Sequence, residues 1–96
     1  MTESKIMDFY HAVTADDGIE VQKILAANLF SKSKIPVKII TGMLIIAVEN
    51  KFVNAGKAIL HYNTYSHEKI TDLHLNAIIC LAAKTDMLSQ LRVTYH

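Results

Sequence analysis

Residues that punctuate or cross-link a chain are scarce in this sequence. Its 96 residues include three glycines, one proline and one cysteine, Cys80. A β-sandwich needs a turn signal about every 8–12 residues, so this scarcity excludes a turn-rich all-β fold. One cysteine excludes an internal disulfide and fits a reducing compartment, from which we expect a cytoplasmic protein.

Long apolar runs and an excess of one charge are also missing. The longest apolar run covers residues 39–48, whereas a membrane span needs about 20 residues. The opening residues carry an acid and lead into no signal-peptide core. Ten basic residues against nine acidic ones leave a net charge of +1, which is too small to favour a phosphate backbone. We therefore expect neither a membrane nor a nucleic-acid partner.

What remains is a chain rich in apolar residues. Hydrophobic residues make up 51% of the chain and charged residues 20%, a composition that excludes disorder. Most apolar residues recur at spacings of three and four, which predicts helices. The spacing of Ile6, Phe9, Tyr10 and Val13 predicts the first helix, and that of Val21, Ile24, Leu25 and Leu29 predicts the second.

Polar breaks divide the rest of the chain into four more helices. The third follows Pro36, which suits the first turn of a helix. It is apolar on almost every side, so we expect it to be buried, with Gly42 allowing close helix packing. The fourth helix opens at Phe52 or Val53 and runs to about residue 62, the fifth covers residues 67–84, and the sixth runs from Met87 to about Tyr95.

An internal repeat connects these helices. It shows in three dipeptides that lie 35 residues apart, each at the end of the first helix of a pair: Ala12-Val13, Ala47-Val48 and Ala82-Ala83. A small residue lets two helices approach closely. In two units an apolar pair follows at the same distance, as Ile24-Leu25 and Ile59-Leu60. We therefore predict one all-α domain over residues 1–96, with three antiparallel helix pairs in units at about residues 4–34, 35–65 and 66–96.

The placement of these pairs resembles the ankyrin repeat, in which Ala-Ala closes the first helix and Leu-Leu closes most of the second. The resemblance implies stacked α-hairpins that bind a protein partner and perform no catalysis. The family's Thr-Pro-Leu-His opening is missing from all three units. Another α-hairpin repeat, or a plain six-helix bundle, therefore stays open as an alternative.

Catalytic and cofactor motifs are missing from the sequence. It contains no G-x-S-x-G nucleophile elbow, and its glycines are isolated at positions 18, 42 and 56 instead of forming a phosphate loop. Cys80 lies among aliphatic residues, where we expect a buried and unreactive thiol. We therefore expect a protein that is not an enzyme and that holds no cofactor and no metal.

Histidines carry the alternative hypothesis. The chain has five of them, and His61 and His67 flank one polar break. Together with Asp72 and His74 they form a candidate set for a small metal-binding protein or enzyme. His67 and His74 are two helical turns apart, about 10 Å along the axis, which is too far for a shared ion. The non-catalytic interpretation is therefore preferred.

The last unit has few charges. After Asp72 only Lys84, Asp86 and Arg92 are charged, so this unit is too apolar to face water as the end of an array. It can be covered by a second copy of the chain, by another protein, or by the next repeat of a longer helical solenoid.

We accordingly predict a protein-interaction module that acts as an adaptor or a stoichiometric inhibitor and self-associates as a homodimer. Tyrosine is frequent at interfaces because it combines an apolar ring with a polar tip. The predicted contact residues lie at the second polar break and in the last unit: Tyr62, Tyr65, His67, Leu75, Ile79 and Tyr95.

Overall fold

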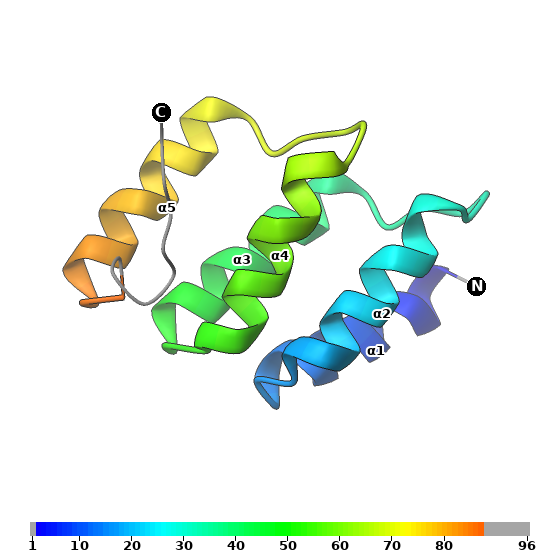
Figure 1. Cartoon of the computed structure of the whole chain (residues 1–96), viewed down its shortest axis with the longest axis horizontal. Coiled ribbons are helices and arrows are strands. Elements are labelled where there is room, and N and C mark those ends of the chain that lie inside the picture. Colours follow the sequence, from blue (N-terminus) through cyan, green and yellow to red (C-terminus); the bar gives the residue numbers. More distant parts are fainter. Residues whose placement is uncertain (1, 88–96) are drawn as a thin grey trace.

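Helices make up most of the backbone that the structure describes. The computed structural model describes residues 2–87, which form α1 (Thr2–Thr14), α2 (Gly18–Leu29), α3 (Val37–Glu49), α4 (Val53–Tyr65) and α5 (Asp72–Lys84) and no strand (Figure 1). The all-α fold class is confirmed. The described part of the chain holds five helices and not the expected six, and the predicted sixth helix lies outside it except for Met87.

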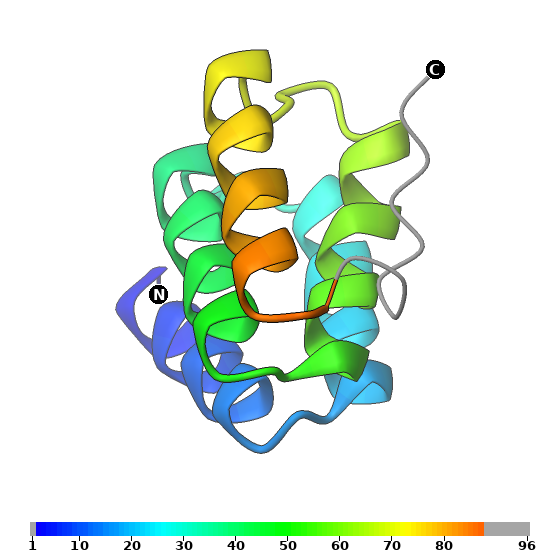
Figure 2. The ribbon, with the colours of Figure 1, turned by 90° about the vertical axis from the view of Figure 1, so that its left-hand side faces the viewer.

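The helices are arranged in two layers. Helices α1, α3 and α5 lie side by side in a three-helix layer, and α2 and α4 form a two-helix layer against it (Figure 2). Each α1–α2 and α3–α4 hairpin therefore contributes one helix to each layer. The largest fully buried side chains include Phe9, Leu25, Leu44 and Ile59. Burying a side chain of this kind contributes about 1.5–3 kcal/mol.

The same turn closes the first helix of every unit. Asp16, Lys51 and Asp86 have φ of 52°, 58° and 63° and are the only residues of the described chain other than glycine with positive φ. The residue after each of them donates its N–H to the alanine carbonyl five positions back, at 2.9, 2.8 and 2.8 Å. The acceptors are Ala12, Ala47 and Ala82, all of them buried. This hydrogen bond is that of a Schellman motif, and it shows the 35-residue register in the backbone.

The loops after α2 and α4 also repeat. Oδ1 of Asn28 accepts the N–H of Ile35 at 2.8 Å, and Oδ1 of Asn63 accepts that of Ile70 at 2.9 Å. Ser31 and Ser66 each donate from Oγ to the carbonyl two residues on. This loop explains why α5 begins at Asp72 and not at the predicted residue 67, since Thr71 is its N-cap and accepts the N–H of His74.

Polar contacts at both ends of the helices tie the first unit to the second. Nδ2 of Asn28 donates to the hydroxyl of Tyr62 at 3.2 Å. Oδ1 of Asp16 accepts the N–H of Ala55 at 2.9 Å, in the first turn of α4. The N-cap of α4, Phe52, has no side-chain hydrogen bond of its own. The first unit therefore supplies a cap that the second unit lacks.

Close helix packing was expected at Gly42, but it occurs at Gly18. A Cβ on Gly18 would lie 2.9 Å from the backbone oxygen of Asn54, so Gly18 allows α2 to approach α4. A Cβ on Gly42 would meet nothing within 4 Å. The prediction that Gly42 allows close packing of helices within this chain is therefore wrong.

Alanine substitutions at these two glycines should have opposite effects. Gly42→Ala should raise the free energy of unfolding by about 1 kcal/mol, because glycine inside a helix is less favourable than alanine by that amount. Gly18→Ala should lower it by about 1–3 kcal/mol through overpacking. Urea unfolding followed by circular dichroism measures both. Equal stabilisation by the two variants would contradict the close approach at Gly18.

The buried Asn28 side chain should contribute more to the free energy of unfolding than an exposed asparagine does. Asn28→Ala leaves the buried N–H of Ile35 without an acceptor and should cost about 1–3 kcal/mol of unfolding free energy. Asn50→Ala is the matched control, because its exposed amide donates only to Ile46 in its own helix. The control should change stability by less than about 0.5 kcal/mol. Equal losses in the two variants would argue against the repeated asparagine contact.

Candidate functional site

Charged side chains cover the outer side of the first unit. Lys5, Asp8, Glu20 and Lys23 stand at the positions where, 35 residues on, the second unit has Ile40, Met43, Ala55 and Ala58. These four residues of the second unit are buried, whereas Asp8, Glu20 and Lys23 are exposed. The first unit thus has the polar outer side that the end of a repeat array requires. A surface for an apolar partner has to be sought elsewhere.

The outward side of the three-helix layer carries such a surface. Two rows of equivalent positions on α1, α3 and α5 contain no charged residue and no buried one, with the positions on α1 and α5 exposed and those on α3 half-buried. We call these two rows the layer face: Met7, Gly42 and Ala77, then Tyr10, Ile45 and Cys80. Met7 is 52% exposed and Tyr10 41% exposed. Charged residues stand one helical turn before and after these rows, at Glu3 and Lys38 and at Glu49 and Lys84.

Gly42 lies at the centre of the layer face. A Cβ placed on it would face open space, because no atom of the described residues beyond its own helix backbone lies within 4 Å. Met7 and Ala77 hold the equivalent positions on the helices to either side. The middle of the layer face therefore leaves the backbone of α3 without a covering side chain.

Cys80 lies on this face, so the prediction of a buried thiol is wrong. The thiol is free and exposed. Helix α5 turns Leu75, Ile78 and Ala82 inward. Cys80 is two residues from both Ile78 and Ala82, which places it about 200° away around the helix. Its aliphatic neighbours in sequence are therefore not its neighbours in space.

The predicted contact residues do not form one surface. Tyr62 and Leu75 are buried, at 5% and 7% exposure, and belong to the core. Tyr65 and His67 are exposed and follow Tyr62 along the chain, while Ile79 is half-buried on α5. Tyr95 lies outside the described residues. Tyr65 and His67 are thus the two predicted residues that are open to a partner.

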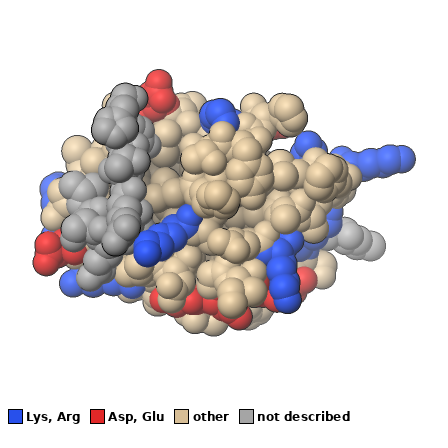
Figure 3. Space-filling view, in the orientation of Figure 1, with Lys and Arg blue, Asp and Glu red and all other residues tan. Residues whose placement is uncertain are grey.

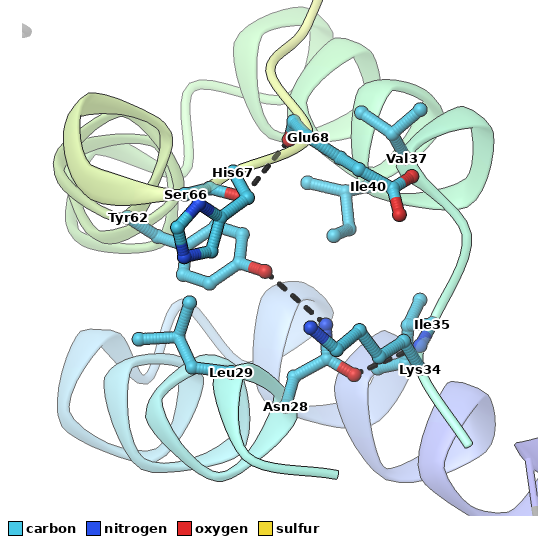
Figure 4. Close-up of a pocket in the computed structure, with 10 residues that line it drawn as sticks. All are labelled: Asn28, Leu29, Lys34, Ile35, Val37, Ile40, Tyr62, Ser66, His67 and Glu68. Atoms are coloured by element: carbon cyan, nitrogen blue, oxygen red, sulfur yellow. Dashed lines mark hydrogen bonds between the residues drawn. The ribbon is translucent and has the colours of Figure 1, made fainter. Parts of the chain in front are cut away.

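Tyr62 and His67 help to line a pocket between the two repeated loops (Figure 4). The pocket measures about 20 Å³, and its walls include Leu29, Lys34 and Ile35. In Figure 4 the Tyr62 hydroxyl points at Asn28, and His67 lies over the tyrosine ring. This volume holds about one water molecule and is too small for a substrate or an organic cofactor. We call it the inter-loop pocket.

A wider depression lies at the opposite end of the helices. It measures about 430 Å³ and includes Asp16, Asp17 and Asn54 in its walls. Both carboxylates are occupied by backbone groups, Asp16 by the N–H of Ala55 and Asp17 by the N–H of Glu20. These acids cap helices, and the depression offers no pair of groups arranged for acid–base chemistry.

His61 and His74 contact different residues. His61 packs edge-on against Tyr65 with ring centroids 5.3 Å apart, and Nδ1 of His74 lies 2.9 Å from Oγ1 of Thr71. Within residues 2–87, no three His, Cys, Asp or Glu side chains are grouped to hold a metal ion. Within the same span, none of the helices has the length and apolar character needed to cross a membrane.

The chain was compared with known proteins. No family model matches it, and neither a curated protein nor a solved structure matches it. The assignment of a function therefore depends on the surfaces described above.

The exposure of Cys80 can be measured directly. In the native protein its thiol should react with an aromatic disulfide reagent at a rate within about tenfold of that in the urea-unfolded protein, because the described residues leave Cys80 exposed. The measurement is the absorbance of the released thiolate against time. A native rate lower by several orders of magnitude would show that the thiol is covered.

Proposed function

We propose that this chain is a non-catalytic protein-interaction module, an adaptor or a stoichiometric inhibitor, which binds its partner on the layer face. The observation that carries the proposal is the uncharged layer face with Gly42 in its middle row. A glycine inside a helix costs about 1 kcal/mol against alanine, and no described residue packs against this position. A partner can therefore approach the backbone of α3 closely there.

The composition of the layer face supports the same function. Met7, Tyr10 and Ile45 offer apolar and aromatic contact area, and residues of this kind are enriched in the buried centres of interfaces. The charges before and after the rows give the surface a polar rim. Ankyrin-like stacking of the units, which we propose from the 35-residue register, is an arrangement suited to such extended surfaces.

A second copy of the chain is the first partner to test. We propose that the protein acts in the cytoplasm and that the layer face supports a homodimer, because a contact between two copies buries the apolar rows of both. Molar mass by light scattering over a concentration series measures this. A homodimer has twice the chain mass of 10.7 kDa. A constant chain mass would exclude a second copy and leave a different protein as the partner.

Substitution at Gly42 should weaken partner binding and leave the fold intact. Gly42→Leu adds a large side chain to the middle of the layer face, and the open space around a Cβ there means that the helix can accept it. Affinity capture from cell extract, followed by titration of each captured protein against the purified chain, should show at least about tenfold weaker binding.

Ala26→Leu is the matched control for this experiment. Ala26 is exposed on α2, in the two-helix layer, so a leucine there enlarges the surface away from the layer face. The control should bind the same partner with unchanged affinity. Equal binding by wild type and both variants would remove the layer face from the proposed function.

A further inference from the structure

The outward side of α3 has a symmetric arrangement of residues. Lys38 and Glu49 are both exposed, and neither side chain makes an ion pair with another described residue. They are eleven residues apart, which places them on the same side of the helix and about 16 Å apart along its axis. Gly42 and Ile45 lie between them, and the two pairs have the same midpoint in the sequence. Turning the helix end for end about this midpoint therefore exchanges Lys38 with Glu49 and Gly42 with Ile45.

We infer that two copies of the chain pack face to face, with α3 of one copy antiparallel to α3 of the other. The twofold axis runs along the two rows of the layer face and passes between them. This inference rests on the proposed homodimer and states which residues meet in it. Lys38 meets Glu49 of the second copy, and the symmetry makes this contact twice. Ile45 of each copy lies over Gly42 of the other, where no described side chain covers the backbone of α3.

The helices on either side of α3 obey the same symmetry. Because the twofold axis runs along the rows, α1 lies on α1 of the second copy and α5 lies on α5. Positions before the axis then oppose positions after it, and no like charges meet. The opposed pairs are Met7 with Tyr10, Ala77 with Cys80, Glu3 with Thr14, and Lys84 with Leu73.

The same charges disfavour a parallel contact. A twofold axis along α3 would place Lys38 on Lys38 of the second copy and Glu49 on Glu49. Like charges that meet across an interface suppress that pairing. Charge therefore selects the antiparallel arrangement.

The size of the layer face predicts a reversible dimer. Helices α1, α3 and α5 have 13 residues each, so each is about 20 Å long. With axes about 8–10 Å apart, the three helices present about 500 Å² in each copy, against about 800 Å² in a standard interface. We therefore expect self-association to increase with concentration.

Charge reversal in the full chain tests the arrangement. Lys38→Glu and Glu49→Lys each bring like charges together twice in the dimer, and each should weaken self-association at least about tenfold in sedimentation equilibrium. A mixture of the two variants should recover the wild-type affinity within about threefold, because every contact between them joins opposite charges. Both changes suit the dipole of α3, with an acid in its first turn and a base in its last, so the helix stays formed.

Lys57→Glu is the matched control, because Lys57 is exposed on α4, in the other layer. The side of the molecule over α2 and α4 carries basic side chains among uncharged ones (Figure 3). The control should self-associate as the wild type does. A mixture of Lys38→Glu and Glu49→Lys that stays as weakly associated as each variant alone would overturn the inference.

Two further outcomes separate this inference from the proposed function. A wild-type mass that stays constant up to about 1 mM overturns the inference and leaves the layer face to a different protein. A dimer that Gly42→Leu weakens but charge reversal does not overturns the antiparallel arrangement, and it keeps the layer face as the interface.

Discussion

The left-handed turn at the end of each first helix is the constraint on which the array depends. Asp16, Lys51 and Asp86 adopt positive φ without being glycine, at a cost of about 1–2 kcal/mol each. The N–H donated to the alanine carbonyl offsets this cost, because it satisfies a group that a helix end leaves open. The turn also fixes the direction in which the chain leaves the helix. Every first helix therefore enters the same layer.

The molecule has a polar end and an apolar layer face because the units carry different residue types at equivalent positions. The first helices of the three units, α1, α3 and α5, begin and end at equivalent positions, so their side chains follow the same order around the helix. Charged residues at the packing positions of the first unit, such as Asp8 and Lys23, make one end of the array polar. Small or apolar residues at the outward positions of the first helices, such as Gly42 and Ile45, make the layer face apolar. One register thus accounts for both the end of the array and its proposed binding surface.

The repeat could be predicted from the sequence because its signal is local. The alanines at positions 12, 47 and 82 are small at a place where small size is required, and all three are buried as expected. The loop motif could also have been found. Asparagine, serine, lysine and isoleucine recur with the same spacing at Asn28, Ser31, Lys34 and Ile35 and again 35 residues later. A polar loop segment predicts only the end of a helix when it is considered alone, and the repeated loop motif becomes visible only when the two loops are compared with each other.

The sites were harder to predict, because exposure depends on the angle around a helix and not on the composition of a segment. Tyr62 and Tyr65 are three residues apart, yet the first is buried and hydrogen-bonded and the second is open. Cys80 was assigned to the core from its neighbours in sequence and lies on the opposite side of α5. Gly42 signals a close approach, but nothing in the chain approaches it. The packing that decides which side of a helix is buried joins distant parts of the sequence, as in the contacts of α5 with α3 and of α2 with α4.

The carboxylate of Asp16 couples the unfolding of the first unit to that of the second. It holds the first turn of α4 from a different unit, and Asn28 joins the same two units at the other end of the helices. Unravelling either hairpin alone would expose polar atoms of its neighbour as well as apolar surface. Coupling between neighbouring units disfavours states in which only one of them is unfolded. The first two units are separate in sequence, but these contacts make the unfolding of one depend on the other.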